Sequence, residues 1–97
     1  MYTLIEKTNK DEVYKLPYKY NSAIVIHMHY HTTRHYWHVA VYFVYAPHFR
    51  TDVIEGNGYV ETRKEARKIA NSLMQTPPDT LWDKLSEFHK NEIKAHV

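Results

Sequence analysis

The stretch from Ala23 to Tyr45, AIVIHMHYHTTRHYWHVAVYFVY, constrains the fold more than any other part of the chain. Its side chains alternate between two faces, which predicts one antiparallel hairpin with Thr32 to His35 as its loop. A slip of one residue would set apolar side chains beside polar ones, so the hydrophobic effect selects a single register. In that register the opposed pairs on one face are all apolar: Tyr30/Trp37, Met28/Val39, Ile26/Val41 and Ile24/Phe43.

The other face of this hairpin is rich in histidine, since five of the eight histidines lie between positions 27 and 38. The register sets His29 opposite His38 with Cβ atoms about 5 Å apart. Imidazoles at this separation can bind Zn²⁺, Ni²⁺ or Cu²⁺, and His27 would be a third ligand. The hairpin itself holds no Asp or Glu to complete or orient a ligand set, so we expect no metal site and no cofactor.

Two further interpretations of this face stay open. In the first interpretation the face is a solvated sheet surface, and in the second it stacks on a partner protein or nucleic acid. The predicted partner-binding face consists of His27, His29, His31, Tyr36, His38 and Tyr42.

Composition limits the class of protein. The 97 residues predict a single domain, residues 1–97, with one modest core. The chain has no cysteine, which excludes disulfides, a thiolate nucleophile and a cysteine-based zinc site. The N-terminus does not resemble a signal peptide, and no apolar run approaches the roughly 18 residues of a membrane span, so we expect a cytoplasmic protein without a membrane partner.

The segments on either side of the hairpin predict shorter elements. Before it, the residues TLIE suggest a short strand, and Thr8 could cap one or two helical turns that Pro17 would end. After it, a third strand is expected over Phe49 to Glu55, with Phe49, Thr51 and Val53 facing the core. Gly56-Asn57-Gly58 then predicts a tight reversal, and Tyr59 and Val60 either extend the sheet or lead into the next element.

Two helices are expected in the C-terminal part. Thr62 and Glu65 have the spacing of a capping box, and an apolar stripe follows them at helical spacing, so a helix is predicted from Thr62 to Gln75. Asp79 or Thr80 is expected to cap a last helix that runs to about Ala95. Its expected stripe consists of Leu81, Leu85 and Phe88, with Trp82 and Ile93 beside it.

The start of the first of these helices carries the strongest local charge. Arg63, Lys64, Arg67 and Lys68 stand there against Glu65, although the whole chain has a net charge of only +2. The N–H groups and the dipole at a helix N-terminus add to the attraction of these cations for phosphate. The alternative is an ordinary solvated helix start.

In the segment from Trp37 to Met74, two predicted strands are followed by Gly-x-Gly and then by the helix sequence TRKEARKIANSLM. This segment resembles the double-stranded RNA-binding domain family. The resemblance implies that Arg63, Lys64 and Arg67 contact phosphates and that the loop with Arg34 and His35 enters a minor groove. The pattern is also similar to the N-terminal DNA-binding modules of phage-type integrases, which use the sheet face instead. The short segment before the hairpin departs from the family, whose first helix precedes the sheet.

The chain shows no pattern typical of a catalytic site. Its three serines, Ser22, Ser72 and Ser86, stand in no Gly-x-Ser-x-Gly motif, and no carboxylates pair on one face, so we expect no enzyme activity.

We therefore expect an α+β domain in which a three-stranded antiparallel sheet, or a four-stranded one with an N-terminal strand, has two C-terminal helices on one face. The core sheet and first helix span residues 23–75 and the last helix residues 80–95. The leading functional hypothesis is a non-enzymatic module that binds duplex nucleic acid, DNA or RNA. The alternatives are a protein-binding inhibitor or adaptor of the kind that phages and mobile elements encode, acting on a host protein, and a metal-binding protein.

Overall fold

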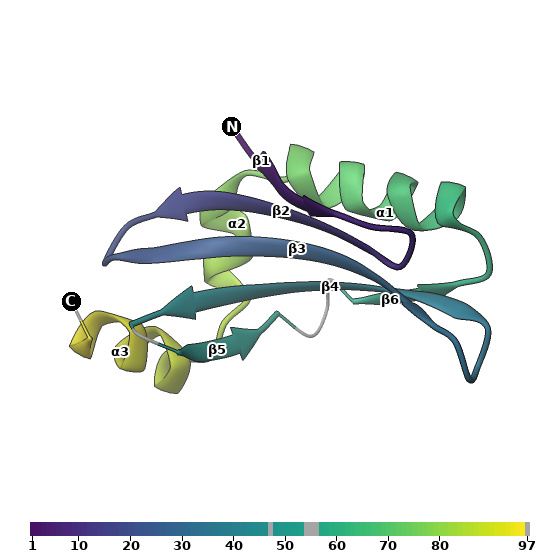
Figure 1. The fold of residues 1–97 in the computed structure, drawn as a ribbon. Coiled ribbons are helices and arrows are strands. Elements are labelled where there is room, and N and C mark those ends of the chain that lie inside the picture. Colours follow the sequence, from purple (N-terminus) through teal and green to yellow (C-terminus); the bar gives the residue numbers. More distant parts are fainter. Residues whose placement is uncertain (47, 54–56, 97) are drawn as a thin grey trace.

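A computed structural model describes residues 1–46, 48–53 and 57–96. It has an α+β fold with one antiparallel sheet of six strands and three helices (Figure 1). No helix in these described ranges is long and apolar enough to cross a membrane. The elements are β1 Thr3–Lys7, β2 Asp11–Tyr18, β3 Ser22–His31, β4 Tyr36–Tyr45, β5 Phe49–Asp52, β6 Gly58–Val60, α1 Arg63–Gln75, α2 Pro78–Asp83 and α3 Glu87–Ala95.

The central hairpin has the predicted register. Strands β3 and β4 pair Tyr30 with Trp37 and Ile24 with Phe43, and the loop is Thr32 to His35 as expected. The opposite face pairs His29 with His38 and His31 with Tyr36. The register is confirmed because its apolar face is the one that the core buries: Ile24, Ile26, Met28, Val39, Val41 and Phe43 are all 0% exposed.

The N-terminal segment is a β-hairpin, so the predicted helical turns after Thr8 are wrong. Strand β2 lies beside β3 and pairs Tyr14 with Ile26, and β1 forms the sheet edge beyond β2. Thr8 caps the hairpin turn instead of a helix, since its hydroxyl accepts hydrogen bonds from the N–H groups of Lys10 and Asp11. The sheet therefore has more strands than the three or four expected.

Pro17 fits inside β2 because of where the β1 ladder ends. The pairing with β1 reaches only Lys15, so Pro17 has a partner strand on one side alone, where it is opposite Ala23. The following turn holds Tyr20 and Asn21 at φ 62° and 53°. A left-handed tyrosine costs roughly 1 kcal/mol, and the Tyr20 ring packs on Trp82 with ring centroids 5.5 Å apart.

Two short strands share the outer edge of β4. Strand β5 pairs with residues 42–45 and β6 with residues 37–39. Between them, the Val41 N–H donates to the Asn57 side chain at 3.2 Å, and the Val41 carbonyl accepts from Val53 N at 2.9 Å. The expected strand from Phe49 is confirmed through Asp52, while its expected end at Ile54 and Glu55, and Gly56 of the expected reversal, lie outside the described residues.

The first predicted helix is confirmed as α1, with Thr62 as its N-cap. The Thr62 hydroxyl accepts a hydrogen bond from Glu65 N at 3.1 Å and donates one to the Glu65 carboxylate at 2.9 Å. Ala66 and Ala70 are fully buried, and their small side chains let α1 approach the sheet closely. Gly58 of β6 faces this helix, since a Cβ there would lie 3.0 Å from Ile69 Cδ1.

The last helix is divided in two, unlike the single helix expected from Thr80. Helix α2 begins at Pro78, a residue suited to a first helical position, and α3 begins after Ser86, whose hydroxyl accepts from His89 N. The break changes the phase of the apolar stripe. Leu81 and Leu85 are buried as predicted, but Phe88 is 68% exposed, so its place in the core is wrong.

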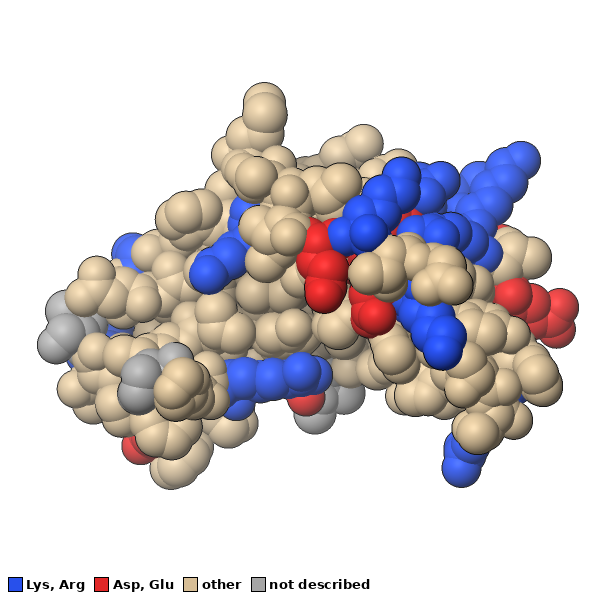
Figure 2. Space-filling model, in the orientation of Figure 1, with Lys and Arg blue, Asp and Glu red and all other residues tan. Residues whose placement is uncertain are grey.

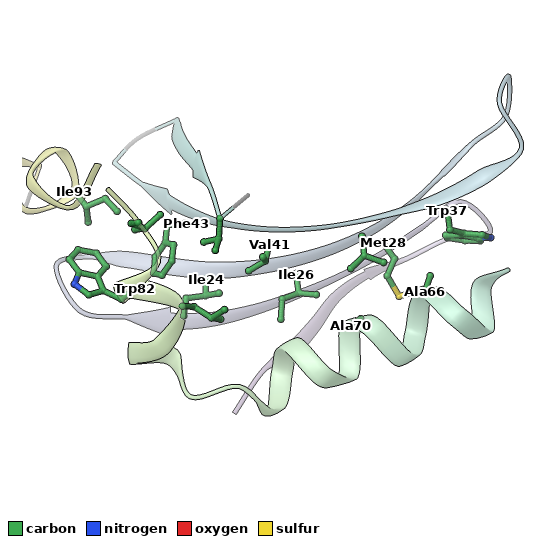
Figure 3. Close-up of a cluster of buried hydrophobic side chains, with 14 residues drawn as sticks. Ile24, Ile26, Met28, Trp37, Val41, Phe43, Ala66, Ala70, Trp82 and Ile93 are labelled. Atoms are coloured by element: carbon green, nitrogen blue, oxygen red, sulfur yellow. The ribbon is translucent and has the colours of Figure 1, made fainter. Parts of the chain in front are cut away.

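The core lies between one face of the sheet and the helices (Figure 3). At one end Met28 and Trp37 pack near Ala66 of α1, and at the other Phe43 packs on Trp82 with ring centroids 5.7 Å apart. His96, after α3, packs on Tyr45 and Phe49 at the end of the sheet near β5. Among the described residues no helix covers the opposite face of the sheet, which carries the histidines (Figure 1).

Replacing Phe43 by alanine should destabilise the protein by about 3–5 kcal/mol, because it removes the ring that both Trp82 and Tyr18 pack against and leaves a cavity. Urea denaturation followed by tryptophan fluorescence measures this free energy. Phe88→Ala is the matched control, and at 68% exposure it should change stability by less than about 0.5 kcal/mol. Equal effects of the two substitutions would contradict the core described above.

Candidate functional site

The four cations at the start of α1 are of two kinds. Arg63 and Arg67 turn towards β2, where both bind the carboxylate of Glu12. Lys64 and Lys68 are exposed. Figure 2 shows Lys and Arg side chains gathered over the start of α1 and the β1–β2 turn, with acidic side chains close by.

Glu12 is the anchor of this arrangement. It lies in β2 on the face under α1 and is only 2% exposed. Its Oε2 accepts hydrogen bonds from Arg63 Nε and Arg67 Nη2, each at 2.9 Å, and its Oε1 accepts one from the Tyr14 hydroxyl at 3.0 Å. Burial alone would raise the pKa of Glu12, but these hydrogen bonds outweigh it and hold the pKa below its usual range.

Arg63 also joins the β1–β2 turn to the helix. Its Nη2 donates to the carbonyl of Thr8 at 2.8 Å, and its guanidinium lies 5.1 Å from the centroid of the Trp37 ring. The turn follows Lys7 and contains Lys10, so these two lysines are brought near the start of α1. The sequence alone does not indicate their place in the basic site, because no local pattern predicts a hairpin over these residues.

The predicted second contact, Arg34 and His35, forms the tip of the β3–β4 hairpin. Both residues are exposed. His35 has φ 56° and its Nδ1 lies 3.2 Å from the Tyr30 hydroxyl, which fixes the shape of the loop. The tip projects at the same end of the sheet as the start of α1 and the β1–β2 turn (Figure 1).

The histidine face carries the six residues predicted for partner binding, all from β3 and β4. His31 stacks on Tyr36 with ring centroids 4.7 Å apart. His38 stacks on Tyr59 of β6 at 4.6 Å with an interplanar angle of 5°. Tyr59 is 64% exposed and extends this aromatic surface, a role that the sequence did not indicate because the residue follows the Gly-Asn-Gly segment.

His38 has a buried ring nitrogen on this face. Its Nε2 is buried and has no hydrogen-bond partner among the described residues. Burial, and next the nearby His31, lower the pKa of His38 below its ordinary value. The two histidines that were paired as metal candidates, His29 and His38, are cross-strand neighbours, but His38 lies outside the group of ligand atoms that the structure brings together.

Asp11 supplies the carboxylate that the hairpin lacks. It is the register partner of His29, and its Oδ1 lies 2.7 Å from His29 Nδ1 and 2.8 Å from His27 Nε2. Burial would raise the pKa of Asp11, but the hydrogen bonds from the two imidazoles lower it overall. The hairpin itself holds no acidic residue, as the sequence shows, but the neighbouring strand β2 places Asp11 beside its histidines.

Tyr42, the remaining predicted residue, is buried at 9% exposure in a small apolar cluster with Val13, Val25 and Ala40. The Arg50 guanidinium lies 3.8 Å from its ring centroid and covers it. Burial raises the pKa of the Tyr42 hydroxyl. Tyr42 thus offers a partner much less surface than Tyr36 or Tyr59.

Comparison with known proteins adds no assignment: no protein family, curated protein or solved structure matches this chain.

Glu12→Gln should destabilise the protein by about 2–3 kcal/mol at pH 7, because the two guanidinium groups lose their buried counter-charge. A carboxylate with a lowered pKa stabilises the fold above its ordinary pKa of 4.5 and loses that effect as the pH falls through the pKa of the folded state. The difference between the two proteins should therefore be largest at neutral pH and shrink in acid.

Urea denaturation from pH 7 to pH 3 tests this expectation. The control is Glu87→Gln, which removes an exposed partner of Lys90 on α3 and should matter by at most about 1 kcal/mol. A Glu12→Gln protein as stable as the parent at pH 7 would show that the two arginines do not depend on the carboxylate.

Proposed function

We propose that the protein is a non-enzymatic nucleic-acid-binding module that contacts duplex phosphates with the basic end of the molecule. The contact surface consists of the start of α1, the β1–β2 turn and the β3–β4 tip. Its cations are Lys7, Lys10, Arg34, Arg63, Lys64, Arg67 and Lys68, with His35 at the tip.

The observation that carries the proposal is the pair of arginines held by Glu12. The Arg63 and Arg67 side chains are still 30% and 44% exposed while bound to the carboxylate. Each guanidinium carries five N–H donors, so donors remain for a phosphate after the contacts with Glu12 are made. Because the carboxylate already orders both side chains, less conformational entropy is lost when they bind a ligand.

The exposed lysines supply charge that Glu12 does not neutralise. Lys64 and Lys68 lie one turn apart on the outer surface of α1. Arg67, Glu12 and Arg63 together keep a charge of +1, so a phosphate backbone meets an attractive surface although Glu61 and Glu65 are close in sequence. Few phosphates can be bound by so small a set, which predicts moderate affinity with a clear dependence on salt.

Lys64→Ala/Lys68→Ala should weaken binding to a short RNA or DNA duplex. The slope of log affinity against log salt should fall in magnitude by roughly 2, since each phosphate contact contributes about 0.9 on B-DNA and two contacts are lost. A gel-shift series from about 50 to 200 mM salt measures this slope. The lysines give a cleaner test than the arginines. Arg63 and Arg67 also bind Glu12, so replacing the arginines would combine a loss of binding with a loss of stability.

Lys15→Ala/Lys94→Ala is the matched control, since it removes the same charge from exposed positions on β2 and α3. It should leave the slope nearly unchanged. Absence of duplex binding by the parent protein at the lowest salt would refute the proposal, and equal losses in the two variants would reduce it to a non-specific charge effect.

The second candidate function is protein binding through the histidine face, and the aromatic stacking there favours it. Exposed Tyr59 covers His38, and Tyr36 covers His31, so the face offers ordered rings that no helix among the described residues covers. Aromatic side chains of this kind are enriched in protein interfaces.

A pull-down from host lysate, with and without nuclease, separates the two functions. If the protein-binding function is right, Tyr36→Ala/Tyr59→Ala should lose a nuclease-resistant partner that Lys64→Ala/Lys68→Ala retains. If nuclease removes every captured protein, or if only the lysine variant loses them, the protein-binding function is wrong.

A further inference from the structure

Three potential metal ligands from two strands meet on the histidine face. They are Asp11 of β2 and His27 and His29 of β3, and their ligand atoms all lie within 4.8 Å of one another. All three side chains are partly accessible, with exposed fractions of 25%, 27% and 43%. An ion could therefore reach them from solvent.

The sheet register creates this arrangement. His27 and His29 are two residues apart on β3 and so point to the same face. Asp11 faces His29 across the ladder, and its carboxylate reaches both rings from the neighbouring strand. The three groups are thus held by paired, regular backbone, which positions ligands more precisely than a loop would.

We propose that Asp11, His27 and His29 form a binding site for a single divalent transition-metal ion of the Zn²⁺ class. The ligands are Asp11 Oδ1, His27 Nε2 and His29 Nδ1. Two imidazoles and one carboxylate are a donor set that Zn²⁺ accepts, and three protein ligands leave a position for water.

The distances suit an ion after a small adjustment. Ligand bonds of about 2.0–2.2 Å place neighbouring donor atoms roughly 3.0–3.6 Å apart. Asp11 Oδ1 is now 2.8 Å from His27 Nε2 and 2.7 Å from His29 Nδ1, as hydrogen bonds require. His27 Nε2 and His29 Nδ1 lie within 4.8 Å of each other. Side-chain rotations that open the two Asp11 pairs by a few tenths of an ångström and bring the two ring nitrogens to the same spacing would admit the ion, while the backbone stays in its ladder.

Tyr42 supplies an outer contact for one ligand. Its hydroxyl oxygen lies 3.4 Å from Nδ1 of His27, the ring nitrogen that does not face Asp11. When Nε2 binds an ion, the proton of a neutral imidazole resides on Nδ1 and can be donated to this hydroxyl. Such outer hydrogen bonds orient histidine ligands in metal sites.

The neighbouring histidines are engaged in other contacts. His31 stacks on Tyr36 and meets the His29 ring edge-on, with centroids 5.1 Å apart. His38 stacks on Tyr59. Neither belongs to the group of three ligands, so the site differs from the His29/His38 pair that the sequence indicated.

Calorimetric titration of the metal-free protein with zinc chloride tests the proposal. One ion should bind per chain, and Asp11→Asn should weaken binding at least tenfold while keeping the shape of the side chain. Asp52→Asn is the matched control, because it removes the same charge from an exposed position beside Arg50 and should leave the affinity unchanged. Thermal unfolding without zinc establishes that each variant is folded.

If Asp11→Asn does not fold, His29→Phe provides the same test, and Co²⁺ provides a second readout. Co²⁺ bound to the three ligands should give visible absorption bands that His29→Phe loses and His48→Ala/His89→Ala retains. Absence of zinc binding by the parent at millimolar zinc would overturn the proposal. So would binding that survives both Asp11→Asn and His29→Phe, or binding that the distant His48→Ala/His89→Ala variant loses.

The site is independent of the proposed duplex binding. It lies on the sheet face opposite α1, so the Lys64→Ala/Lys68→Ala variant should bind zinc like the parent. A protein that binds zinc but no duplex would refute the proposed function alone, and one that binds duplex but no zinc would refute this inference alone.

Discussion

Burial of the apolar face of the β3–β4 hairpin determines the rest of this structure. Ile24, Ile26 and Met28 oppose Phe43, Val41 and Val39, and all six are removed completely from solvent. At about 25 cal/mol per Å² of apolar surface, the complete burial of these six side chains strongly favours this one arrangement. Because strand side chains alternate, the same register necessarily places the histidines together on the other face. The aromatic and histidine surface is thus a consequence of how the core is paired.

Local pattern was enough to predict the parts of the fold that depend on neighbours in sequence. The hairpin loop is set by alternation on both sides of it, and the start of α1 by the spacing of Thr62 and Glu65. The sequence does not predict strand β2, although Glu12, Tyr14 and Leu16 point to one face of it and the residues between them to the other. Its core-facing residues include a carboxylate, and its apolar residues are few, so the period of two is weak. Thr8 and Pro17 look like the boundaries of a helix. In the structure Thr8 instead caps the β1–β2 turn, and Pro17 lies in the part of β2 that extends beyond its pairing with β1.

The candidate sites show the same division between local and distant information. The sequence located the cations of α1 and the histidines of β3, but it could not identify their acidic partners. Glu12 is 51 residues from Arg63, and Asp11 is 16 from His27. Such contacts exist only once β2 has docked on β3, and no local pattern encodes that event. The division between α2 and α3 is not predicted because the local pattern is ambiguous. Ser86 is a good helix cap, but the apolar spacing of Leu81, Leu85 and Phe88 is also compatible with one continuous helix.

Asp11 and Glu12 are consecutive residues of an edge hairpin, and they serve opposite faces of the sheet. Their side chains are separated only by the thickness of one strand layer. Local unfolding commonly involves such peripheral hairpins as units. If β1 and β2 detached together, two arginines on one face and two histidines on the other would lose their carboxylates in the same event. The N-terminal hairpin therefore links the charge state of both surfaces to one opening equilibrium, and a ligand that binds either surface with the hairpin docked would reduce opening at both.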